Sequence, residues 1–593
     1  MENNRNFFIT IVLSVIILTA WQILYMNPRI EAQREAQRIE AEREEAKKPE
    51  NAGTDPSIPQ PEGAADDVPD AGTEQAKAAR VKIETPKLSG SINLAGARLD
   101  DLILNDYRVT VEPNSPRITL LEPVNGGQGY FTEIGYTGAG DQKLYPGADT
   151  IWTVKIGQML TPSTPVTLTY NNGNGLVFDR TISIDEDYLF TISDSVTNNS
   201  GGAVALANYG RITRLEEPEI AGFFILHEGL IGVTGEEGLQ EIDYDDLVED
   251  KQVKPGKSND GWLGFTDKYW AVATVPAKDR PFQPRFSWFE SNGGRYQSDY
   301  LSDEFVVQPG ASETIETLVF AGAKQVSVID GYEVDHGIRQ FELMIDWGWF
   351  HFITKPLFYL IDWLFKLLGN FGLAILGTTV LVKLVFFPLA NKSYASMARM
   401  KVVQPAMMEI KEKFGDDKMK QQQAMMELYK KEKINPLAGC WPILIQIPVF
   451  FALYKVLFVT LEMRHAPFYG WIRDLAAPDP TSIFNLFGLL PYDVPSFLLI
   501  GVWPLLMGIT MFLQMQMNPT PPDPTQAMIF KWMPVVFTFM LATFPAGLVI
   551  YWAWNNFLSI LQQGVIMKRN GAKIELWDNL KGLFAKKPET PAE

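Results

Sequence analysis

Cysteine is almost absent from this chain of 593 residues, which contains only Cys440. A single cysteine excludes an internal disulfide framework and any metal cluster held by several cysteines. Histidine is also rare, and the four histidines are far apart, without the HExxH spacing of a zinc helix: His227, His336, His351 and His465. We therefore expect no metal ion and no other cofactor.

Motifs for catalysis are missing as well. The stretch VKPGKS, Val253–Ser258, contains GKS but lacks the earlier glycine and the flanking strand and helix of a phosphate-binding loop. The motif GxSxG does not occur, and the acidic run Glu241–Asp250 lacks the pattern of a Ca²⁺ loop. A formal net charge of −18 argues against binding to a specific nucleic acid sequence. We expect a protein that is not an enzyme.

Apolar residues are distributed unevenly along the chain. The region from Pro49 to about Asp335 is rich in polar residues, glycine and proline, whereas Met344–Met567 is dominated by Leu, Ile, Val, Phe, Met and Trp. The length alone predicts at least two domains. The composition predicts that one domain lies in water and the other in a membrane.

Six apolar runs are candidate membrane spans. The first, Phe7–Met26, lacks the short core and the A-x-A-like end of a cleavable signal peptide, so we interpret it as an uncleaved anchor. Five further runs follow, the last two separated only by Pro545–Gly547: Phe371–Leu389, Leu437–Leu461, Phe497–Met517, Ile529–Phe544 and Leu548–Met567. The sequence thus predicts six transmembrane helices, of which five form a core.

Lysine and arginine predict the orientation of these spans. The connection after the third span carries only Arg464 and Arg473, whereas the connection before it carries ten basic residues. These ten are Lys392, Arg399, Lys401, Lys411, Lys413, Lys418, Lys420, Lys430, Lys431 and Lys433. Together with a tail that begins MKRNGAK, they place both termini in the cytoplasm and the segment from Asn27 to about Asp346 outside.

The exported segment begins with a charged run, Arg29–Lys48, which is typical of a helix. Residues up to about 80 have the Pro, Gly, Ala and acidic composition of a flexible linker. From Val81 onwards, short alternating runs such as YLFTISDSVTN and SETIETLVFAG are separated by turns. This pattern predicts a β-sandwich of many strands, and it contains no readable active site.

Met344–Leu368 is aromatic throughout, and its polar residues share one helical stripe: His351, Lys355, Tyr359, Asp362 and Lys366. We expect an amphipathic helix in the outer membrane–water interface, with Trp349, Phe352 and Phe358 in lipid. The alternative is an overlong transmembrane helix, which the charges disfavour.

The basic connection, residues 392–436, predicts a helical hairpin, because two helical stretches flank a turn at Phe414–Asp417. Its apolar residues are mainly methionines, six of which we assign to a substrate-capturing surface: Met400, Met407, Met408, Met419, Met425 and Met426. Methionine surfaces adapt to partners of variable sequence. Alternatively, the hairpin buries these residues within itself, and both interpretations can hold together.

Lys383 is a charge inside an apolar span, where insertion near the bilayer centre costs about 2.5–3.5 kcal/mol. It shares a helix face with Thr379 and Ile375. A lysine that faces lipid could extend its amine to the cytoplasmic surface. We favour a lysine that faces inward, into a wet cavity.

Other polar groups lie within or beside the later spans: Gln446, Gln514, Gln516, Asn555, Asn556, Ser559, Gln562 and Gln563. Lys455 is a second unusual charge, but it lies nearer the outer end of its span. We expect it to reach the interface or to pair with Glu462, seven residues further along.

Four long stretches resemble the YidC membrane protein insertase family, in its Gram-negative form with a large periplasmic domain. They are FGLAILGTTVLVKLVFFPL, GDDKMKQQQAMMELYKKEKINPLAGCWPILIQIPVFFALY, EMRHAPFYGWIRDL and FPAGLVIYWAWNNFLSILQQ. The resemblance covers essentially the whole chain. It implies a β-supersandwich in the exported domain, similar to sugar-binding enzymes but without an established sugar ligand.

The resemblance also implies a hydrophilic groove in the inner leaflet, open to the cytoplasm and to lipid. A positive residue of the first core span, commonly Arg, lies there and attracts acidic residues of the incoming chain. Lys383 occupies that position, although Lys cannot bind a carboxylate in the bidentate way of Arg. Trp552 stands where a tyrosine is usual, and Tyr551 directly precedes it. The expected substrate groove is Lys383, Thr379, Gln446, Tyr551 and Trp552.

The sequence as a whole predicts a polytopic α-helical membrane protein with a large periplasmic all-β domain. The expected domains are the anchor (1–28), a charged helix and linker (29–80), the β-sandwich (81–343), the interfacial helix (344–370), the insertase core (371–567) and a cytoplasmic tail (568–593).

The expected function is the insertion and folding of integral membrane proteins in the bacterial inner membrane. The resemblance implies nascent membrane proteins, the Sec translocon, the translating ribosome and membrane lipids as partners. A secondary transporter is the main alternative, but no repeated half is visible. An intramembrane protease lacks its motif, and an exported ligand sensor on a mere anchor stays open as a third class.

Overall fold

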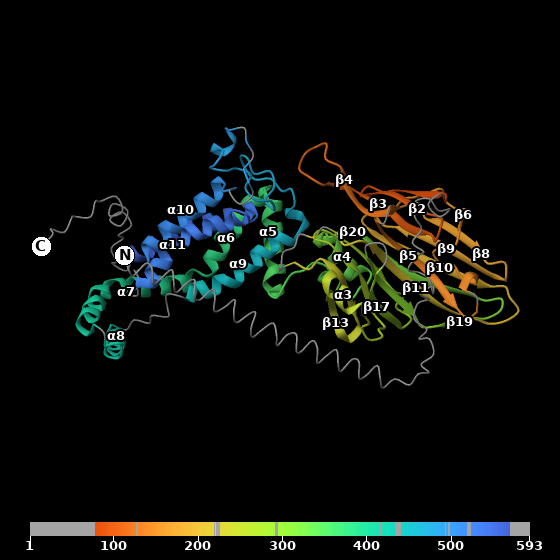
Figure 1. Ribbon diagram of the computed structural model, residues 1–593, viewed down its shortest axis with the longest axis horizontal. Helices are drawn as coiled ribbons and strands as arrows, with labels where there is room; N and C mark the ends of the chain where they lie inside the picture. Colours follow the sequence, from red (N-terminus) through yellow and green to blue (C-terminus); the bar gives the residue numbers. More distant parts are fainter. Residues whose placement is uncertain are drawn as a thin grey trace. The chain divides into compact units, whose positions relative to one another are not determined.

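The computed structural model describes residues 78–569, apart from 126–127, 141, 219, 221–225, 291–293, 416, 433–440, 491, 493, 496–498 and 519–523. The predicted anchor Phe7–Met26, the charged run Arg29–Lys48, the linker up to residue 77 and most of the tail lie outside these residues. Within them, β-strands come first along the chain and helices follow (Figure 1). This order agrees with the change in composition near residue 340.

Two antiparallel sheets form the strand region, apart from one short parallel pair. Eleven strands make the first sheet, in the order β14-β17-β18-β11-β5-β4-β3-β2-β1-β7 with β19 paired to β11. Their bounds are β14 Gln252–Val253, β17 Phe282–Phe289, β18 Arg295–Ser302, β11 Val204–Leu215, β5 Gln128–Gly138, β4 Arg117–Asn125, β3 Arg98–Arg108, β2 Leu88–Asn93, β1 Arg80–Glu84, β7 Met159–Leu160 and β19 Phe305–Val307.

Nine strands make the second sheet, in the order β13-β12-β15-β16-β20-β10-β9-β8-β6. Their bounds are β13 Gly238–Ile242, β12 Gly229–Thr234, β15 Gly261–Thr266, β16 Trp270–Val275, β20 Ser312–Ala323, β10 Leu189–Asn198, β9 Leu176–Ile184, β8 Val166–Asn171 and β6 Thr153–Ile156. In β9 every second residue is buried, which is typical of a sheet with one face on the core.

A charged pair lies in the core of the strand region. Arg180 donates to both carboxylate oxygens of Asp194 at 2.7 Å, and the Tyr136 hydroxyl donates to the same carboxylate at 2.9 Å. All three side chains are almost completely buried. A buried charge is tolerated only when it is paired and hydrogen-bonded, and this pair meets both conditions.

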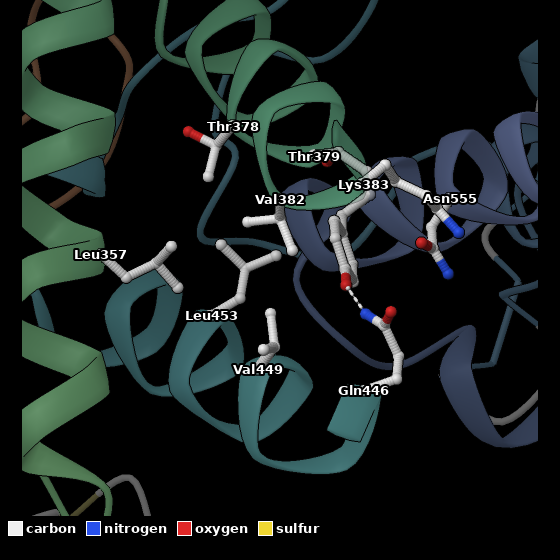
Figure 2. Close-up of a pocket in the computed structure, with 10 residues that line it drawn as sticks. Leu357, Thr378, Thr379, Val382, Lys383, Gln446, Val449, Leu453 and Asn555 are labelled. Atoms are coloured by element: carbon white, nitrogen blue, oxygen red, sulfur yellow. Dashed lines mark hydrogen bonds between the residues drawn. The ribbon is translucent and has the colours of Figure 1, made fainter. Parts of the chain in front are cut away.

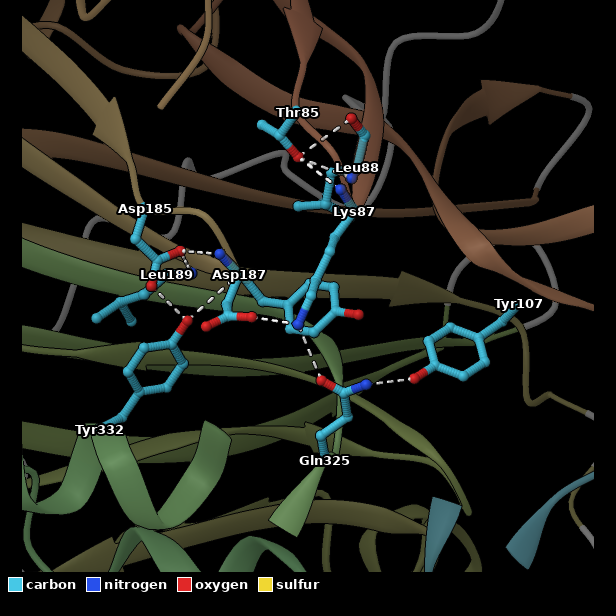
Figure 3. Close-up of polar contacts among 10 residues, drawn as sticks. Thr85, Lys87, Leu88, Tyr107, Asp185, Asp187, Leu189, Gln325 and Tyr332 are labelled. Atoms are coloured by element: carbon cyan, nitrogen blue, oxygen red, sulfur yellow. Dashed lines mark hydrogen bonds and ion pairs between the residues drawn. The ribbon is translucent and has the colours of Figure 1, made fainter. Parts of the chain in front are cut away.

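A polar network fixes helix α4, Val326–Asp335, to the strands (Figure 3). Gln325, which precedes the helix, accepts a hydrogen bond from Lys87 at 3.0 Å and donates one to the Tyr107 hydroxyl at 2.7 Å. At the other end of the network, the Tyr332 hydroxyl donates to Asp185 at 2.5 Å. The start of α4 is therefore held in a defined position.

Helix α5, His351–Leu368, follows a 3₁₀ turn at Phe341–Met344, so it begins later than the predicted Met344. Lys355 of the predicted polar stripe forms ion pairs with Asp330 at 3.0 Å and with Glu342. Trp349 and Phe352 are 97% and 74% exposed, as expected for residues in lipid. Phe358 was expected there too, but that prediction is wrong, because it is buried against Trp347.

Helix α6, Phe371–Val385, is shorter than the predicted span, and α7, Phe387–Phe414, continues from it after a bend of 69°. Pro388 lies in the first turn of α7, where its missing N–H costs nothing, so a new helix direction begins there. α8, Lys418–Lys431, completes the hairpin, and the turn between α7 and α8 lies where the sequence predicted it.

The remaining long helices are α9 Trp441–Val459, α10 Val502–Met517, α11 Pro524–Leu541 and α12 Ala546–Arg569. The described part of the chain also contains short elements: η2 Gln142–Leu144, η3 Gly235–Glu237, α3 Tyr244–Asp250, η6 Leu461–Met463 and η7 Leu486–Gly488. Within the residues described, α6 and α7 pass a length-and-hydropathy test for a membrane span only as a bent pair, and no helix passes it alone. The number of spans stays a prediction.

Candidate functional site

Lys383 lies in the last turn of α6 and faces α12. Its amine donates a hydrogen bond to the Ser559 hydroxyl at 2.5 Å, and that hydroxyl donates to the Asn555 carbonyl at 2.7 Å. In the described part of the chain, no acidic side chain forms an ion pair with Lys383. The ammonium is thus held in place with its charge uncompensated by any of these residues.

The buried face of α6 explains why Lys383 faces inward. Phe371, Ala374, Ile375, Thr378 and Thr379 are all buried and recur at helical spacing. Lys383 continues this face one turn after Thr379. The same packing that buries the apolar half of α6 therefore directs the amine toward the helices rather than away from them.

A second polar contact lies across the pocket from α6. The Gln446 amide of α9 donates to the Tyr551 hydroxyl of α12 at 2.6 Å (Figure 2). Tyr551 is almost fully buried, and Gln446 is half-buried. This hydrogen bond joins α9 to α12 beside the pocket that contains Lys383.

One pocket brings these groups together (Figure 2). It is lined by Leu357, Thr378, Thr379, Val382, Lys383, Gln446, Val449, Leu453, Tyr551 and Asn555. Its residues come from α5, α6, α9 and α12. The structure therefore places four of the five predicted groove residues, Lys383, Thr379, Gln446 and Tyr551, around a single pocket.

A neighbouring pocket extends the same site along α7. It shares Lys383, Gln446, Val382 and Val449 with the first pocket and adds Phe386, Leu389, Ala390, Tyr394 and Gln562. The bend after Val385 brings α7 into this position. The two pockets, with all the lining residues named above, are together called the Lys383 groove below.

The hydroxyls on α6 differ in their partners. Thr379 donates to the Ile375 carbonyl of its own helix at 2.8 Å, so its hydroxyl is already satisfied. The Thr378 hydroxyl and the Asn555 side-chain oxygen are buried without a partner among the described residues. Buried polar atoms of this kind are uncommon, and a substrate or water can satisfy them.

Trp552 lies on a different face of α12. Its ring is 4.9 Å from that of Phe450 and stacks at 5.4 Å on that of Phe537. It lines neither pocket of the Lys383 groove. The aromatic residue of α12 that lines the groove is Tyr551, one position earlier than the tyrosine position that the resemblance implied.

The prediction from sequence did not assign Asn555, Ser559, Gln562 and Tyr394 to the site, where Ser559 holds the Lys383 amine and the other three line the groove. The first three follow Tyr551 at intervals of four, eight and eleven residues, which is the spacing of one helix face. This periodicity could have identified them. Tyr394 has no comparable signal, because it reaches the groove only through the bend between α6 and α7.

The hairpin methionines divide into two groups. Met407 is buried with Val403, and Met400 and Met425 pack against them. Met408, Met419 and Met426 are exposed. Three of the six methionines therefore form the small core of the hairpin, and substrate capture by the three exposed ones stays a prediction.

Lys455 has a partner other than the predicted one. Its amine is 2.7 Å from the carboxylate of Asp346, which also accepts a hydrogen bond from the His227 backbone at 3.0 Å. Glu462 instead accepts a hydrogen bond from the Val326 backbone. Pairing between Lys455 and Glu462 was therefore the wrong expectation, although Lys455 does form an ion pair.

Comparisons with known proteins agree with the two-part organisation. A family model described as YidC periplasmic domain matches residues 80–360, and one described as 60Kd inner membrane protein matches residues 363–573. The chain is 64% identical over 604 residues to a protein of Mesorhizobium japonicum and 61% identical over 600 residues to one of Rhizobium meliloti. Both are named membrane protein insertase YidC, and each match covers 100% of both chains.

Among solved structures, the crystal structure of an active YidC insertase with its first transmembrane domain resolved is similar to this chain. The match has a TM-score of 0.33 and 17% identity and covers 81% of this chain and 91% of that one. The full-length identity to the curated relatives is decisive. The chain belongs to the YidC family.

Proposed function

We propose that this chain is a membrane protein insertase of the bacterial inner membrane, and that the Lys383 groove receives the polar part of the incoming protein. The single observation that carries the proposal is the Lys383 amine, held by Ser559 in a pocket of mixed polar and apolar lining with no paired acid among the described residues. A fixed and uncompensated cation is suited to attract a carboxylate. It is a binding group, and no step of the process requires it to lose its proton.

The energetics fit reversible binding. An ammonium and a carboxylate about 4 Å apart gain about 1 kcal/mol in bulk water and about 4 kcal/mol at an effective dielectric constant of 20. Such an attraction retains a polar tail briefly and still releases it. The apolar helix of the substrate then leaves the groove for lipid, and burial of its surface, at about 25 cal/mol per Å², drives the step.

The proposal includes a topology. Six spans cross the membrane, both termini and the α7–α8 hairpin lie in the cytoplasm, and the two-sheet domain lies in the periplasm. The support is the distribution of basic residues: Lys and Arg are concentrated on the hairpin and the start of the tail. In this orientation the hairpin and the nearby end of the Lys383 groove, with Tyr394 and Gln562, lie on the cytoplasmic side.

Partners follow from this arrangement. Nascent integral membrane proteins are the substrates, and the exposed methionines of the hairpin are suited to contact their varied apolar segments. The Sec translocon and the translating ribosome are proposed to bind beside the groove and at the basic hairpin, respectively. Lipids surround the exposed apolar faces of the core helices.

The test is an insertion assay in proteoliposomes with a short two-span substrate. Lys383→Met keeps the apolar stem of the side chain and removes the charge, so we expect slower insertion by a correctly folded protein. Lys366→Met is the matched control, because Lys366 is an exposed lysine of α5 that does not line the groove.

Equal rates for both variants and the wild type would contradict the assigned role of Lys383. The same vesicles also distinguish an insertase from a transporter. Uptake of a small solute without any insertion of the two-span substrate would overturn the proposed function itself.

A further inference from the structure

The connection between η6 and α10 contains an exposed apolar loop, described at residues 484–490 and 492. Six of its large apolar residues are exposed, and Leu489 is 81% exposed: Phe484, Leu486, Phe487, Leu489, Leu490 and Tyr492. No charged residue occurs between Asp479 and Asp493. A contiguous apolar surface of this kind indicates an interaction site rather than an ordinary water-facing loop.

Asp479 holds the base of this loop in place. Its buried carboxylate accepts hydrogen bonds from the Trp471 indole and the Thr481 backbone at 3.0 Å each, and from the Thr481 hydroxyl at 2.7 Å. It also accepts one from the Trp503 backbone at 3.0 Å, which caps the first turn of α10. A Cβ at Gly501 would overlap this carboxylate. The loop is therefore fixed to the start of α10.

The tip of the loop has an ordered and strained backbone. Phe487 donates to the Ser482 carbonyl at 2.7 Å, and Leu490 donates to the Asn485 carbonyl at 3.0 Å. Leu486 and Phe487 have φ values of 50° and 60°, in the left-handed region that bulky residues avoid. Strain of this kind persists only where the surrounding contacts impose it, and it is concentrated at functional sites.

The chemistry of the surface favours a lipid bilayer as its partner. The loop lies between two apolar helices, α9 and α10, and α10 itself exposes the apolar residues Leu506 and Ile509. Tyr469, Trp471 and Tyr492 are exposed in the same connection. Tyrosine and tryptophan prefer the membrane–water interface, because their rings are apolar and their polar ends remain hydrated.

We propose that the apolar loop, residues 484–490 with Tyr492, inserts into the headgroup–acyl boundary of the outer leaflet and anchors the start of α10 in the membrane. The inference rests on the proposed function in one respect, because it requires that α9 and α10 span the bilayer. The loop then acts together with α5 to fix the depth of the helical region on that side. Apolar residues that would be unfavourable in water are buried in lipid at this depth.

The test is a depth measurement on the full-length protein in vesicles that contain lipids with a quencher near the headgroup. Cys440→Ser provides the background, and a single cysteine at Leu489→Cys carries an environment-sensitive fluorophore. Two matched sites are Ile509→Cys, on the exposed face of α10, and Val306→Cys, an exposed apolar position on β19. We expect a blue-shifted emission at 489 that the lipid quencher reduces, and an aqueous signal at 306.

The inference would be overturned if the fluorophore at position 489 gave the same aqueous signal as the one at position 306 while the one at position 509 reported lipid. The proposed membrane topology would then stay intact. An aqueous signal at 509 as well would instead contradict the topology. If 489 is shielded only after a partner protein is added to the vesicles, the surface binds protein and the assignment to lipid is wrong.

Discussion

The Glu462 carboxylate accepts a hydrogen bond from the backbone N–H of Val326 at 2.9 Å. Val326 is the first residue of α4 in the strand region, and Glu462 lies in η6, shortly after the end of α9 in the helical region. A residue of the helical region thus caps a helix that the strands hold in position. The other carboxylate oxygen of Glu462 is buried without a partner among the described residues. Burial raises the pKa of Glu462 to about 7.

We predict that the burial of the Glu462 carboxyl, which outweighs the opposing hydrogen bond from Val326, makes stability pH-dependent. The unfolded chain has an ordinary Glu pKa of 4.5, so the folded protein binds the proton more tightly. The stabilisation is therefore complete below pH 4.5 and is lost as the pH rises through about 7. A difference of about 2.5 pKa units corresponds to roughly 3 kcal/mol. Melting temperatures in detergent from pH 4.5 to 8 measure this effect.

Glu462→Gln is the matched control for the pH series. Its amide oxygen can still accept the Val326 hydrogen bond, but the side chain does not titrate. The difference in melting temperature between wild type and variant should therefore change across this range. A constant difference would show that Glu462 does not titrate in the folded protein.

The ion pair between Lys455 and Asp346 predicts a second, larger effect on stability. Both side chains are mostly buried, so removing one leaves a charge without its partner, at a cost of about 3–5 kcal/mol. Lys455→Met should therefore lower the melting temperature strongly, and Asp346→Asn should restore part of the loss in the Lys455→Met background. A double-mutant cycle measures the coupling. Simple additivity would contradict a direct interaction.

Tyr551 and Trp552 should differ in the property that each one controls. Tyr551→Phe removes the hydrogen bond from Gln446 in the groove and costs about 1 kcal/mol of stability, so slower insertion should be its main effect. Trp552→Ala removes packing against Phe450 and Phe537, and large-to-small changes of this kind cost about 3 kcal/mol or more. Measured melting temperatures and insertion rates should separate the two variants. The assignment of Tyr551 fails if Trp552→Ala retains stability but loses insertion.

The exposed methionines of the hairpin should act in capture. Replacing Met408, Met419 and Met426 with Ser should reduce crosslinking to a nascent membrane protein without changing protease resistance of the hairpin. Met407→Ser should instead reduce the protease resistance of the hairpin and leave crosslinking unchanged, because Met407 is buried in the small core of the hairpin. Unchanged crosslinking in the triple variant would exclude these three residues as contacts.

Local patterns in the sequence predicted much of this fold. Alternation in the segments that form β10 and β20 predicted strands, and the turn at Phe414–Asp417 predicted the hairpin. Helical spacing predicted that Lys383 and Thr379 lie on one face of α6, and both residues line the same pocket. These features depend on neighbours a few residues apart, so the sequence carries them directly.

Other features depend on contacts that no local pattern encodes. Val326 and Glu462 are 136 residues apart, and Asp346 and Lys455 are 109 residues apart. The bend after Val385 was also missed, because the apolar run continues to Leu389 and hydropathy does not record helix direction. Without that bend, Tyr394 could not be assigned to the groove.

The final prediction concerns the charge of Lys383. The amine is fixed by Ser559, so its effect on insertion should depend on the charge of the translocated tail. Lys383→Arg should keep most activity, because a cation of similar reach remains, although Ser559 must adjust to a larger head. Lys383→Met should slow insertion most for tails that carry Asp or Glu, by about tenfold if about 1.4 kcal/mol of attraction is lost.

Lys383→Glu distinguishes attraction from hydration, because it preserves a charged, hydrated side chain and reverses the sign. If Lys383 acts by charge attraction, acidic tails should insert more slowly in Lys383→Glu than in Lys383→Met. Neutral tails should insert at similar rates in both variants. Basic tails should insert faster in Lys383→Glu than in Lys383→Met. Matched substrates that differ only in tail charge provide the measurement, at low and high salt, because screening should reduce the differences. Equal losses for acidic, neutral and basic tails would show that Lys383 supports the hydrated shape of the groove, and charge attraction would be excluded.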